Sequence, residues 1–331
     1  MDGNAPLAVT MGDPAGIGGE LTVMAWARRI AARLPPFYAI DDPARLRRIG
    51  GSLPVAEIDH PSEAMAVFGE ALPVLPLPLP APQPPGQPVA ANAGAVIASI
   101  ERAVADVGAG RAAAVVTNPI NKRALHEGAG FAYPGHTEFL AALGKVETPV
   151  MMLAAPGLRV VPLTVHCALR DIFNGITRDS ILRTARILHE AMRRDFALPA
   201  PRIAVSGLNP HAGEGGSMGR EEIEIIAPAI AALQAEGIAT SGPWPGDTMF
   251  HEDARAGYDV ALCMYHDQAL IPLKTLDFHR GVNITLGLSF VRTSPDHGTA
   301  YDRAGTGTAD PRSFIEALRT ARAMADARGA S

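Results

Sequence analysis

Short apolar runs alternate with amphipathic helical segments along nearly the whole chain. Strands that alternate with helices in this way usually pair in parallel, because each helix carries the chain back across the sheet. The pattern therefore predicts an α/β fold with parallel strands. Strands are expected over residues 6–10, 37–40, 112–116, 150–153, 158–165, 203–205, 259–264 and 282–291, and helices through 21–26 and over 92–107, 179–194, 220–235 and 312–327.

One segment, residues 73–88, departs from this alternation because it is dense in proline. Proline has no backbone N–H to donate within a sheet, so a central strand is a poor assignment there. We expect an edge strand or an extended surface connection.

Length and charge limit the classes of protein that remain. A chain of 331 residues, 47% hydrophobic and 19% charged, can form two domains or one large α/β unit. Its net charge of −5 gives no bias towards nucleic acid or an anionic membrane. Six arginines form the basic cluster and are expected on solvated helix faces: Arg28, Arg29, Arg33, Arg45, Arg47 and Arg48.

Targeting signals and disulfide patterns are both missing from the sequence. The first ten residues lack the cationic and apolar regions of a signal peptide, and no apolar stretch is long enough to span a membrane. We therefore expect a cytoplasmic protein. The two cysteines, Cys167 and Cys263, are expected to be free thiols that serve as packing residues.

Three of the ten histidines follow predicted strands. His166 ends the run LRVVPLTVH, His266 ends DVALCMYH, and His211 lies in a glycine-rich loop, GLNPHAGEGGSMGR, named here the histidine loop. Ligands bind at the carboxyl ends of strands in open parallel sheets, so these side chains could converge. Three imidazoles with an open position suit Zn²⁺ or a similar divalent ion acting as a Lewis acid.

Other assignments for these histidines are weaker. For any one of them alone, a hydrogen-bonded core histidine is the usual role. A thiolate zinc site with Cys167 or Cys263 is disfavoured, because adjacent strand residues point to opposite faces of a sheet.

Two carboxylates near the histidines are candidate acid/base groups. Asp267 follows His266 directly, and Asp247 lies in the turn GPWPGDTMF, where a helix N-cap is the alternative role. A polar set suited to a phosphate or carboxylate substrate follows, comprising Lys274, Asn283 and Arg292.

Two glycine-rich segments could bind a nucleotide. Residues 11–20, MGDPAGIGGE, imitate a dinucleotide fingerprint, but Leu21 occupies the third glycine position and Asp13 stands where a pyrophosphate would approach. Residues 296–310, DHGTAYDRAGTGTAD, are the better candidate, since backbone amides there could bind phosphates and Asp302 could meet a ribose or adenine. We name this second segment the cofactor loop.

Several long motifs also follow one another in a familiar order: MGDPAGIG, TNPINK, GHTEFLA, GLNPHAGEGGSMGREE, GPWPGDTMF, YHDQALIPLK, GVNITLG and SFVRTSPDHGTA. Through them nearly the whole chain resembles the 4-hydroxythreonine-4-phosphate dehydrogenases, the PdxA family of vitamin B6 biosynthesis. The resemblance implies a fold similar to isocitrate and isopropylmalate dehydrogenases, with two α/β/α domains around a central cleft. The implied bounds are residues 1–130 with 290–331 for a cofactor-side domain, and 131–289 for a metal, substrate and dimerisation domain.

The same resemblance implies the reaction. The enzyme would use NAD or NADP and one divalent metal ion per site, Zn, Mg or Co. It would oxidise 4-phosphohydroxy-L-threonine at C3 to a β-keto acid that decarboxylates to 3-amino-2-oxopropyl phosphate. Threonate or erythronate 4-phosphate, or a dihydrodiol carboxylate, are the alternative substrates. A homodimer with its site at the subunit interface is implied, with no nucleic acid or membrane partner.

The resemblance also implies roles for individual residues. The metal ligands would be His166, His211 and His266, with Asp247 and Asp267 as catalytic acid/base residues. His136, Thr137, Lys274, Asn283 and Arg292 would hold the substrate, and Gly298, Asp302, Gly305 and Gly307 the cofactor. From the residues alone, a hydrolase or aldolase using the same histidines and a binding protein without catalysis stay open.

Overall fold

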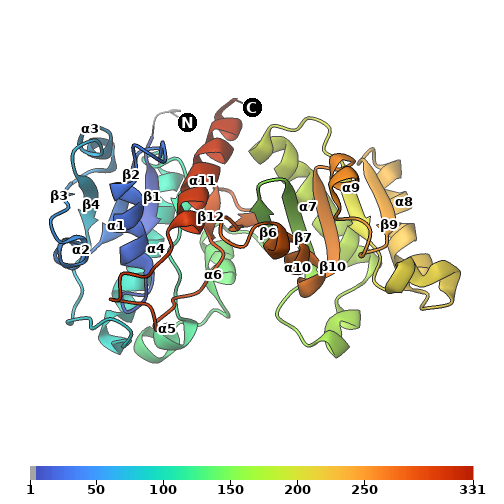
Figure 1. The fold of residues 1–331 in the computed structure, drawn as a ribbon, viewed down its shortest axis with the longest axis horizontal. Helices are drawn as coiled ribbons and strands as arrows, with labels where there is room; N and C mark the ends of the chain where they lie inside the picture. The colour runs from blue at the N-terminus through green and yellow to red at the C-terminus, as the bar shows by residue number, and fades with distance from the viewer. Residues whose placement is uncertain (1–4, 331) are drawn as a thin grey trace. The chain divides into compact units, whose positions relative to one another are not determined.

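Strands and helices alternate through residues 5–330, which the computed structural model describes, and this confirms the predicted α/β class. The chain divides into two units, shown in Figure 1. The first runs to Pro149 and resumes over Leu288–Ala330, and the second is Val150–Gly287. Residues 131–149, expected in the second domain, belong to the first unit, because Phe139 and Leu140 pack in its core.

The first unit is built on a parallel sheet in the order β3-β4-β2-β1-β5-β12. Its strands are β1 (Leu7–Thr10), β2 (Phe37–Asp41), β3 (Val55–Glu57), β4 (Leu72–Pro76), β5 (Val115–Val116) and β12 (Arg292–Pro295). Its α-helices are α1 (Gly18–Ala27), α2 (Pro43–Gly50), α3 (Ala64–Val67), α4 (Ala93–Gly108), α5 (Lys122–Ala129), α6 (His136–Leu143) and α11 (Arg312–Ala330).

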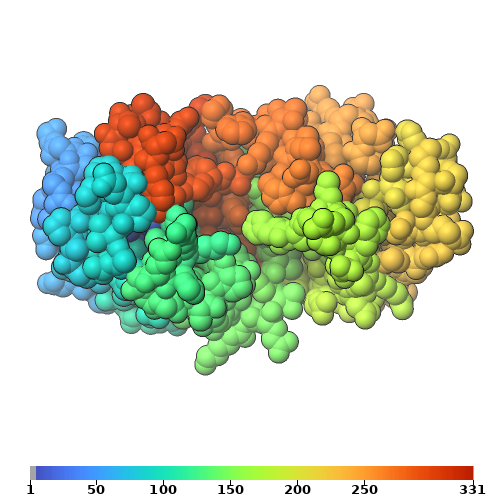
Figure 2. Space-filling view, turned by 90° about the horizontal axis from the view of Figure 1, so that it is seen from below, coloured from blue at the N-terminus to red at the C-terminus, as the bar shows by residue number. Residues whose placement is uncertain are grey.

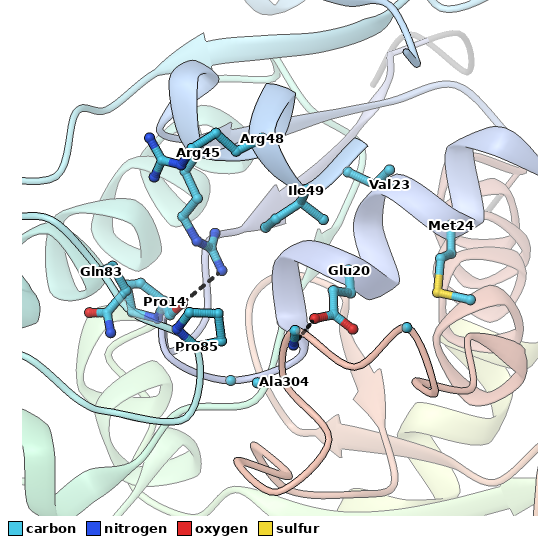
Figure 3. Close-up of a pocket in the computed structure, with 13 residues that line it drawn as sticks. Pro14, Glu20, Val23, Met24, Arg45, Arg48, Ile49, Gln83, Pro85 and Ala304 are labelled. Atoms are coloured by element: carbon cyan, nitrogen blue, oxygen red, sulfur yellow. Dashed lines mark hydrogen bonds between the residues drawn. The ribbon is translucent and has the colours of Figure 1, made fainter. Parts of the chain in front are cut away.

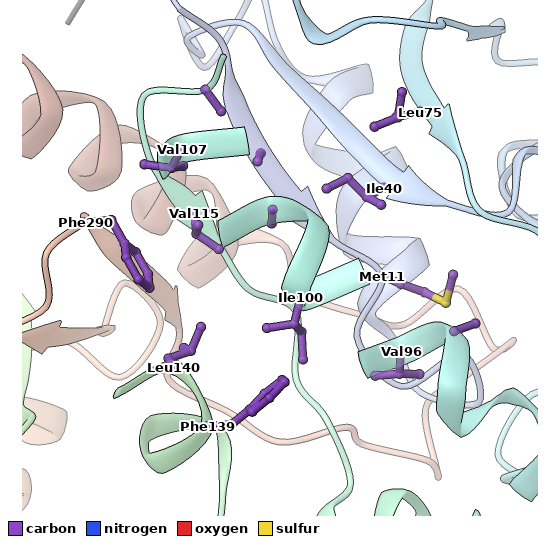
Figure 4. Packing of buried hydrophobic residues seen from close by; sticks show 14 of the residues in the cluster. Met11, Ile40, Leu75, Val96, Ile100, Val107, Val115, Phe139, Leu140 and Phe290 are labelled. Carbon is purple, nitrogen blue, oxygen red and sulfur yellow. The ribbon is translucent and has the colours of Figure 1, made fainter. Parts of the chain in front are cut away.

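Helices cover both faces of this sheet. Ala8 and Tyr38 share a core with residues of α4 such as Ile100, and Figure 4 shows this cluster. Leu7 and Val9 point to the opposite face and are equally buried, on the side where α11 packs against β12 and α1. Full burial of β1 on both faces is typical of a parallel sheet between two helical layers.

β4 corrects the expectation for the proline-dense segment, because it lies between β2 and β3 and is not an edge strand. Pro73 precedes Val74, the first residue paired with β2. Pairing with β3 ends at Val74, so Pro76 pairs with β2 alone. Each proline therefore lies where one of the two ladders has not begun or has already ended. Residues 77–88, by contrast, form the expected extended connection.

The arginine cluster also differs from expectation at one position. Arg45 is buried and not solvated, since its guanidinium pairs with Asp41 at 2.8 Å and donates to the carbonyl oxygen of Pro14. A charge can be buried when its partner and its hydrogen bonds are also present. Asp41 lies only four residues before Arg45, but the sequence pattern could not show the contact with Pro14.

The second unit has a mixed sheet in the order β11-β6-β7-β10-β8-β9. β6 pairs antiparallel with both β7 and β11, so the expectation of parallel pairing throughout is wrong for these strands. Only two residues separate β6 from β7, which leaves no room for a helical crossover. The strands are β6 (Val150–Ala155), β7 (Leu158–Thr164), β8 (Ile203–Ser206), β9 (Thr240–Trp244), β10 (Val260–Tyr265) and β11 (Val282–Leu286).

The helices of this unit are α7 (Arg178–Phe196), α8 (Ala227–Ala235), α9 (Glu252–Ala256) and α10 (His266–Leu276). The helix expected over 220–235 begins with a π-helical turn, Glu222–Ile226, before α8. The strand expected over 282–291 stops at Leu286, because Gly287 has a φ of +84°.

The two cysteines differ in their surroundings. Both are free thiols, as expected, and Cys263 is buried in the core of the second unit. Cys167 is exposed, because β7 ends at Thr164 and the chain then leaves the sheet, so its assignment as a packing residue is wrong. Among residues 5–330, no helix combines the length and apolar character needed to cross a membrane.

Candidate functional site

Three histidines stand at one edge of the second unit's sheet. β7, β10 and β8 are neighbours that run parallel, so their carboxyl ends lie at the same edge. His166 lies just beyond β7, and His211 lies in the loop after β8. His266, expected to end its strand, instead begins α10 directly after β10. All three side chains therefore follow adjacent strand ends.

Two of these histidines have an uncommon backbone conformation. φ is 49° at His166 and 52° at His211, in the left-handed region that residues other than glycine rarely adopt. His211 begins a run of positive φ values that continues to Gly216. Such strain tends to persist where function requires it. The backbone thus supports a functional role for the histidine loop.

The imidazole rings of His166 and His266 are neighbours, with 6.0 Å between their centroids. Across residues 5–330, no three His, Cys, Asp or Glu side chains are gathered closely enough to hold a metal ion. Each of the three histidines is exposed or half-exposed, and imidazole nitrogen is a preferred ligand of Zn²⁺ and similar ions. The donor chemistry fits a metal ion, although these ligands do not form a closed set within the described chain.

Asp267 contacts His266 directly. Its Oδ1 lies 2.8 Å from Nδ1 of the imidazole. A carboxylate on Nδ1 fixes the orientation of the ring and leaves Nε2 available for a ligand, as it does behind metal-bound histidines.

A cavity of about 670 Å³ connects His211 with both candidate acid/base residues, since Asp247 and Asp267 also line it. Asp247 is exposed in the turn before α9. The N-cap of α9 is His251, so the alternative role of Asp247 as the cap of that helix is wrong.

One buried carboxylate organises the start of the histidine loop. Oε1 of Glu222 accepts hydrogen bonds from the backbone N–H groups of Leu208 and Asn209, both at 2.7 Å. Its Oε2 accepts from Nδ2 of Asn209 at 2.9 Å. Burial opposes ionisation of Glu222, but these hydrogen bonds outweigh it and hold the pKa of the carboxyl below its usual range. Glu222 therefore acts as a fixed anion behind the loop.

Gln268 joins the ends of two strands beside the cavity. Its Oε1 accepts from Oγ of Ser206 at 2.7 Å and from the backbone N–H of Met264 at 2.8 Å. Its Nε2 donates to the carbonyl oxygen of Gly207 at 2.8 Å. The carboxyl ends of β8 and β10 are thereby held together.

Two residues of the expected substrate set lie in this unit. Asn283 is on β11, and its Oδ1 is buried without a hydrogen-bond partner among the described residues. Lys274 is in the last turn of α10, where its Nζ lies 5.8 Å from the ring centroid of Phe278. A buried acceptor without a partner is costly unless a ligand or water satisfies it.

The first unit holds the rest of that set. Burial lowers the pKa of Arg292 to about 10, so its guanidinium is charged at neutral pH. It donates from Nε and Nη2 to Oγ1 of Thr117, at 3.1 and 2.7 Å. Burial and the charge of Arg292 hold the pKa of His136 well below its usual range, so that imidazole is neutral. Nε2 of His136 is buried with no described hydrogen-bond partner, and Thr137 follows it on α6.

The cofactor loop is fastened to the loop that follows β1. Oη of Tyr301 donates to Oδ2 of Asp13 at 2.5 Å, and burial together with this hydrogen bond raises the pKa of the tyrosine. The residues expected to contact the cofactor are all exposed, namely Gly298, Asp302, Gly305 and Gly307.

Sequence reasoning missed the residues that support this site. Asn209, Glu222 and Gln268 stand within the motifs that carry His211 and His266, and this position was the available signal. Their hydrogen bonds to backbone groups depend on the folded chain and could not be derived from spacing.

Comparison with known proteins places these features in a family. The chain matches one family model over residues 34–321, described as "Pyridoxal phosphate biosynthetic protein PdxA". It is 56% identical to a 4-hydroxythreonine-4-phosphate dehydrogenase of Methylorubrum populi, and the match covers 97% of this chain and 94% of the relative.

Solved structures agree. A 4-hydroxythreonine-4-phosphate dehydrogenase from Klebsiella pneumoniae superposes with a TM-score of 0.89 at 42% identity, covering 97% of this chain and 99% of the other. A terephthalate 1,2-cis-dihydrodiol dehydrogenase from Burkholderia xenovorans LB400 gives a TM-score of 0.67 at 28% identity, covering 96% and 98%.

Proposed function

This chain belongs to the PdxA family of pyridoxal phosphate biosynthetic proteins, and from that premise we propose which of its residues perform each part of the reaction. The predicted activity, that of a 4-hydroxythreonine-4-phosphate dehydrogenase in vitamin B6 biosynthesis, is confirmed by the family match and by relatives of that name. Because the chain is a dehydrogenase of this family, the hydrolase, aldolase and binding-protein alternatives are set aside. The observation that supports our residue assignment is the placement of His166, His211 and His266 after neighbouring strands.

The reaction follows from the family. The C3 alcohol of 4-phosphohydroxy-L-threonine loses a proton and a hydride, which gives a β-keto acid. Loss of CO₂ from that acid leaves 3-amino-2-oxopropyl phosphate. The hydride acceptor is a nicotinamide nucleotide, which we propose to be NAD⁺ or NADP⁺, bound at the cofactor loop.

The three histidines are the proposed metal ligands. A divalent ion held there, Zn²⁺, Mg²⁺ or Co²⁺, would lower the pKa of the substrate alcohol and stabilise negative charge on its oxygen. Asp267 keeps the ring of His266 oriented through Nδ1, and Glu222 holds the backbone from which His211 extends. The imidazoles are thereby positioned before an ion arrives.

Asp247 and Asp267 are the proposed acid/base residues. Both line the cavity that also contains His211, so either carboxylate can approach an alcohol bound beside that imidazole. Within residues 5–330, Asp247 makes no hydrogen bond to a histidine, whereas Asp267 is paired with His266. We therefore assign removal of the proton from the substrate alcohol to Asp247. Asp267 is assigned the orientation of the His266 imidazole and a second acid/base role.

Binding of the phosphorylated substrate is assigned to cationic and polar side chains. Arg292 supplies a buried positive charge, and His136 presents a neutral ring nitrogen without a described partner. Asn283 presents a buried amide oxygen, to which a substrate hydroxyl or amine can donate. Lys274 adds a second positive charge and Thr137 a hydroxyl. Lys274 and Arg292, together with Asn283, favour a phosphorylated substrate over the dihydrodiol carboxylate, because two cations suit the charge and the several acceptor oxygens of a phosphate group.

We further propose that the enzyme is a cytoplasmic homodimer with its site at the subunit interface. The first unit would bind the cofactor, and the second would bind the metal ion and form the interface. Large apolar side chains that follow His166 and His266 within a few residues of the chain are exposed, including Leu169 (64%), Phe173 (52%) and Ile271 (63%). Figure 2 shows the segment Leu169–Asn174, in yellow-green, at the surface. Apolar surface of this kind is typical of subunit contacts.

A substrate panel tests the proposed function. The purified enzyme should reduce NAD⁺ or NADP⁺ with 4-phosphohydroxy-L-threonine and a divalent ion, and should do so poorly with threonate 4-phosphate, erythronate 4-phosphate or a dihydrodiol carboxylate. His211→Ala should remove activity and metal binding together, whereas His60→Ala, at an exposed histidine of the first unit, should keep both. Faster turnover of any other substrate in the panel would contradict the assignment.

A further inference from the structure

The connection over residues 77–88, named here the strap, touches both glycine-rich segments. The backbone N–H of Gly86 donates to the carbonyl oxygen of Ala15, in the loop after β1, at 2.8 Å. A Cβ on Gly86 would lie 2.9 Å from the carbonyl oxygen of Tyr301, in the cofactor loop. A Cβ on Gly305 of that loop would lie 2.9 Å from Cβ of Pro85. At Gly86 the backbone therefore meets backbone, and at Gly305 it meets a proline ring, so both positions favour glycine.

The strap is itself fixed to the body of the first unit. Asn92, which is buried, accepts from the backbone N–H of Ala81 at 3.0 Å and donates to its carbonyl oxygen at 3.1 Å. The same amide donates to Oε1 of Gln83 at 3.0 Å. At its start, the backbone N–H of Leu79 donates to Oδ2 of Asp42 at 3.0 Å. The strap is thus a firm surface for the cofactor loop.

A few other contacts join the cofactor loop to the residues that follow β1. They are the hydrogen bond from Tyr301 to Asp13 and that from the N–H of Ile17 to the carbonyl oxygen of Thr299 at 3.0 Å. The N–H of Gly305 also donates to Oε1 of Glu20.

Behind these contacts the loop is not packed. Pro14, Pro85, Glu20 and Ala304 border a cavity of about 510 Å³, seen in Figure 3. A loop that borders a cavity gains little from packing, so a small number of point contacts determines its conformation.

We propose that Gly86 of the strap and the Asp13–Tyr301 pair are positioning residues that set the cofactor loop in the conformation that binds the nicotinamide nucleotide. This inference rests on the proposed role of that loop. It gives the proline-dense segment a function: a strap with few backbone donors and little freedom presents a close-fitting backbone surface to the loop. None of these residues is placed among the reacting groups, so they should affect nucleotide affinity and leave the chemical step unchanged.

Gly86→Ala provides the main test, with Gly110→Ala as its matched control. The two glycines have nearly equal φ, +73° and +72°, so alanine is equally strained at both. Only at Gly86 would the new Cβ meet the loop, because nothing lies within 4 Å of the Cβ position at Gly110. Relative to Gly110→Ala, Gly86→Ala should raise KM for the nucleotide about tenfold, with kcat and KM for the substrate little changed. Equal nucleotide KM in the two variants would overturn the proposal.

Tyr301→Phe provides a test that adds no backbone strain. It removes only the hydroxyl that donates to Asp13, and Tyr258→Phe, which removes a hydroxyl that donates to Met249 at 2.9 Å, is its control. Binding of ADP-ribose, measured by calorimetry without turnover, should weaken severalfold in Tyr301→Phe and in Gly86→Ala but not in the controls.

The two readouts separate this inference from the proposed function. If the wild-type enzyme oxidises no substrate in the panel, the proposed function fails, while ADP-ribose binding still reports on the loop. If the wild type is active and all four variants bind ADP-ribose like the wild type, the strap and the tyrosine have no positioning role.

Discussion

Glu222 shows how one side chain can determine the geometry of a loop. It is 3% exposed and accepts hydrogen bonds from two backbone N–H groups and one side-chain amide. Glu222→Gln removes the charge and leaves one of these donors facing another donor, which should cost about 1–3 kcal/mol of unfolding free energy at pH 7. Urea unfolding of this variant and of Glu224→Gln, at an exposed residue nearby, measures the difference.

The pH dependence of that difference has a definite sign. Because the pKa of Glu222 is lower in the folded protein than in the unfolded chain, the ionised carboxylate stabilises the fold above the unfolded value of about 4.3. This stabilisation is lost as the pH falls through the lower folded-state pKa. The difference in unfolding free energy between wild type and Glu222→Gln should therefore become smaller in acid. A gap that widens there would contradict the role assigned to the carboxylate.

Asp267 acts on a single imidazole. Asp267→Asn removes the charge beside Nδ1 of His266, so the ring loses its fixed orientation and some basicity as a ligand. Metal affinity should fall about 10- to 100-fold, the usual effect of losing such a partner. Titration with Zn²⁺ or Co²⁺ measures it, with Asp59→Asn, an exposed position in the first unit, as the control. Unchanged metal affinity together with lost turnover would assign Asp267 to proton transfer alone.

At the residue scale, the sequence was informative where chemistry follows from residue type. The positions of His166, His211 and His266 after strands could be predicted, because apolar runs mark the strands and imidazole marks the ligand. Burial of Arg45 could not be predicted, because it depends on the loop after β1 packing against the Arg45–Asp41 pair in the folded chain. The same reason explains why Gln268 was missed.

Between elements, a buried carboxylate joins α4 to the sheet of the first unit. Oδ2 of Asp106, near the end of α4, accepts from Oη of Tyr38 on β2 at 2.7 Å. Its Oδ1 accepts from Nε of both Arg102 and Arg111, each at 2.9 Å. Burial and the charge of Asp106 raise the pKa of Tyr38, so the tyrosine remains a neutral donor. The helix is thereby tied to β2, the strand that ends at Asp41.

Asp106→Asn tests that connection. The amide has one acceptor atom where the carboxylate has two, so at least one of the three donors loses its partner inside the protein. We expect a loss of about 2–3 kcal/mol in unfolding free energy. Asp326→Asn removes a half-exposed carboxylate that pairs with Arg322 on α11 and should cost well under 1 kcal/mol. Equal effects of the two substitutions would show that the buried network adds nothing beyond a surface pair.

Elements were predictable where local pattern determines them. The alternation of apolar runs located α4, α7 and α11 closely, because their buried faces recur at helical spacing. The antiparallel pairing of β6 could not be predicted, since it depends on which strands become neighbours. The π-helical turn that begins at Glu222 was also hidden, because its residue pattern is that of an ordinary helix.

For the whole molecule, mixing inactive subunits tests whether one site draws residues from two chains. The His166 and His266 rings are 6.0 Å apart, and the described part of one chain does not form a closed ligand set. If a homodimer completes the site, His211→Ala and His266→Ala homodimers should each be inactive. When the two variants are co-refolded in equal amounts, half of the dimers contain one subunit of each kind. Each mixed dimer can carry one intact site if His211 and His266 of that site come from different subunits.

Activity should then return to about a quarter of the wild-type value in the mixture. Phe173→Asp, which places a charge on the exposed apolar surface, should weaken the dimer in analytical ultracentrifugation and reduce activity in parallel. Ile30→Asp, at an exposed apolar residue of the first unit, is the control and should do neither. A monomeric Phe173→Asp enzyme with full activity would refute the shared site, because a monomer has no second subunit to contribute a metal-ligating histidine.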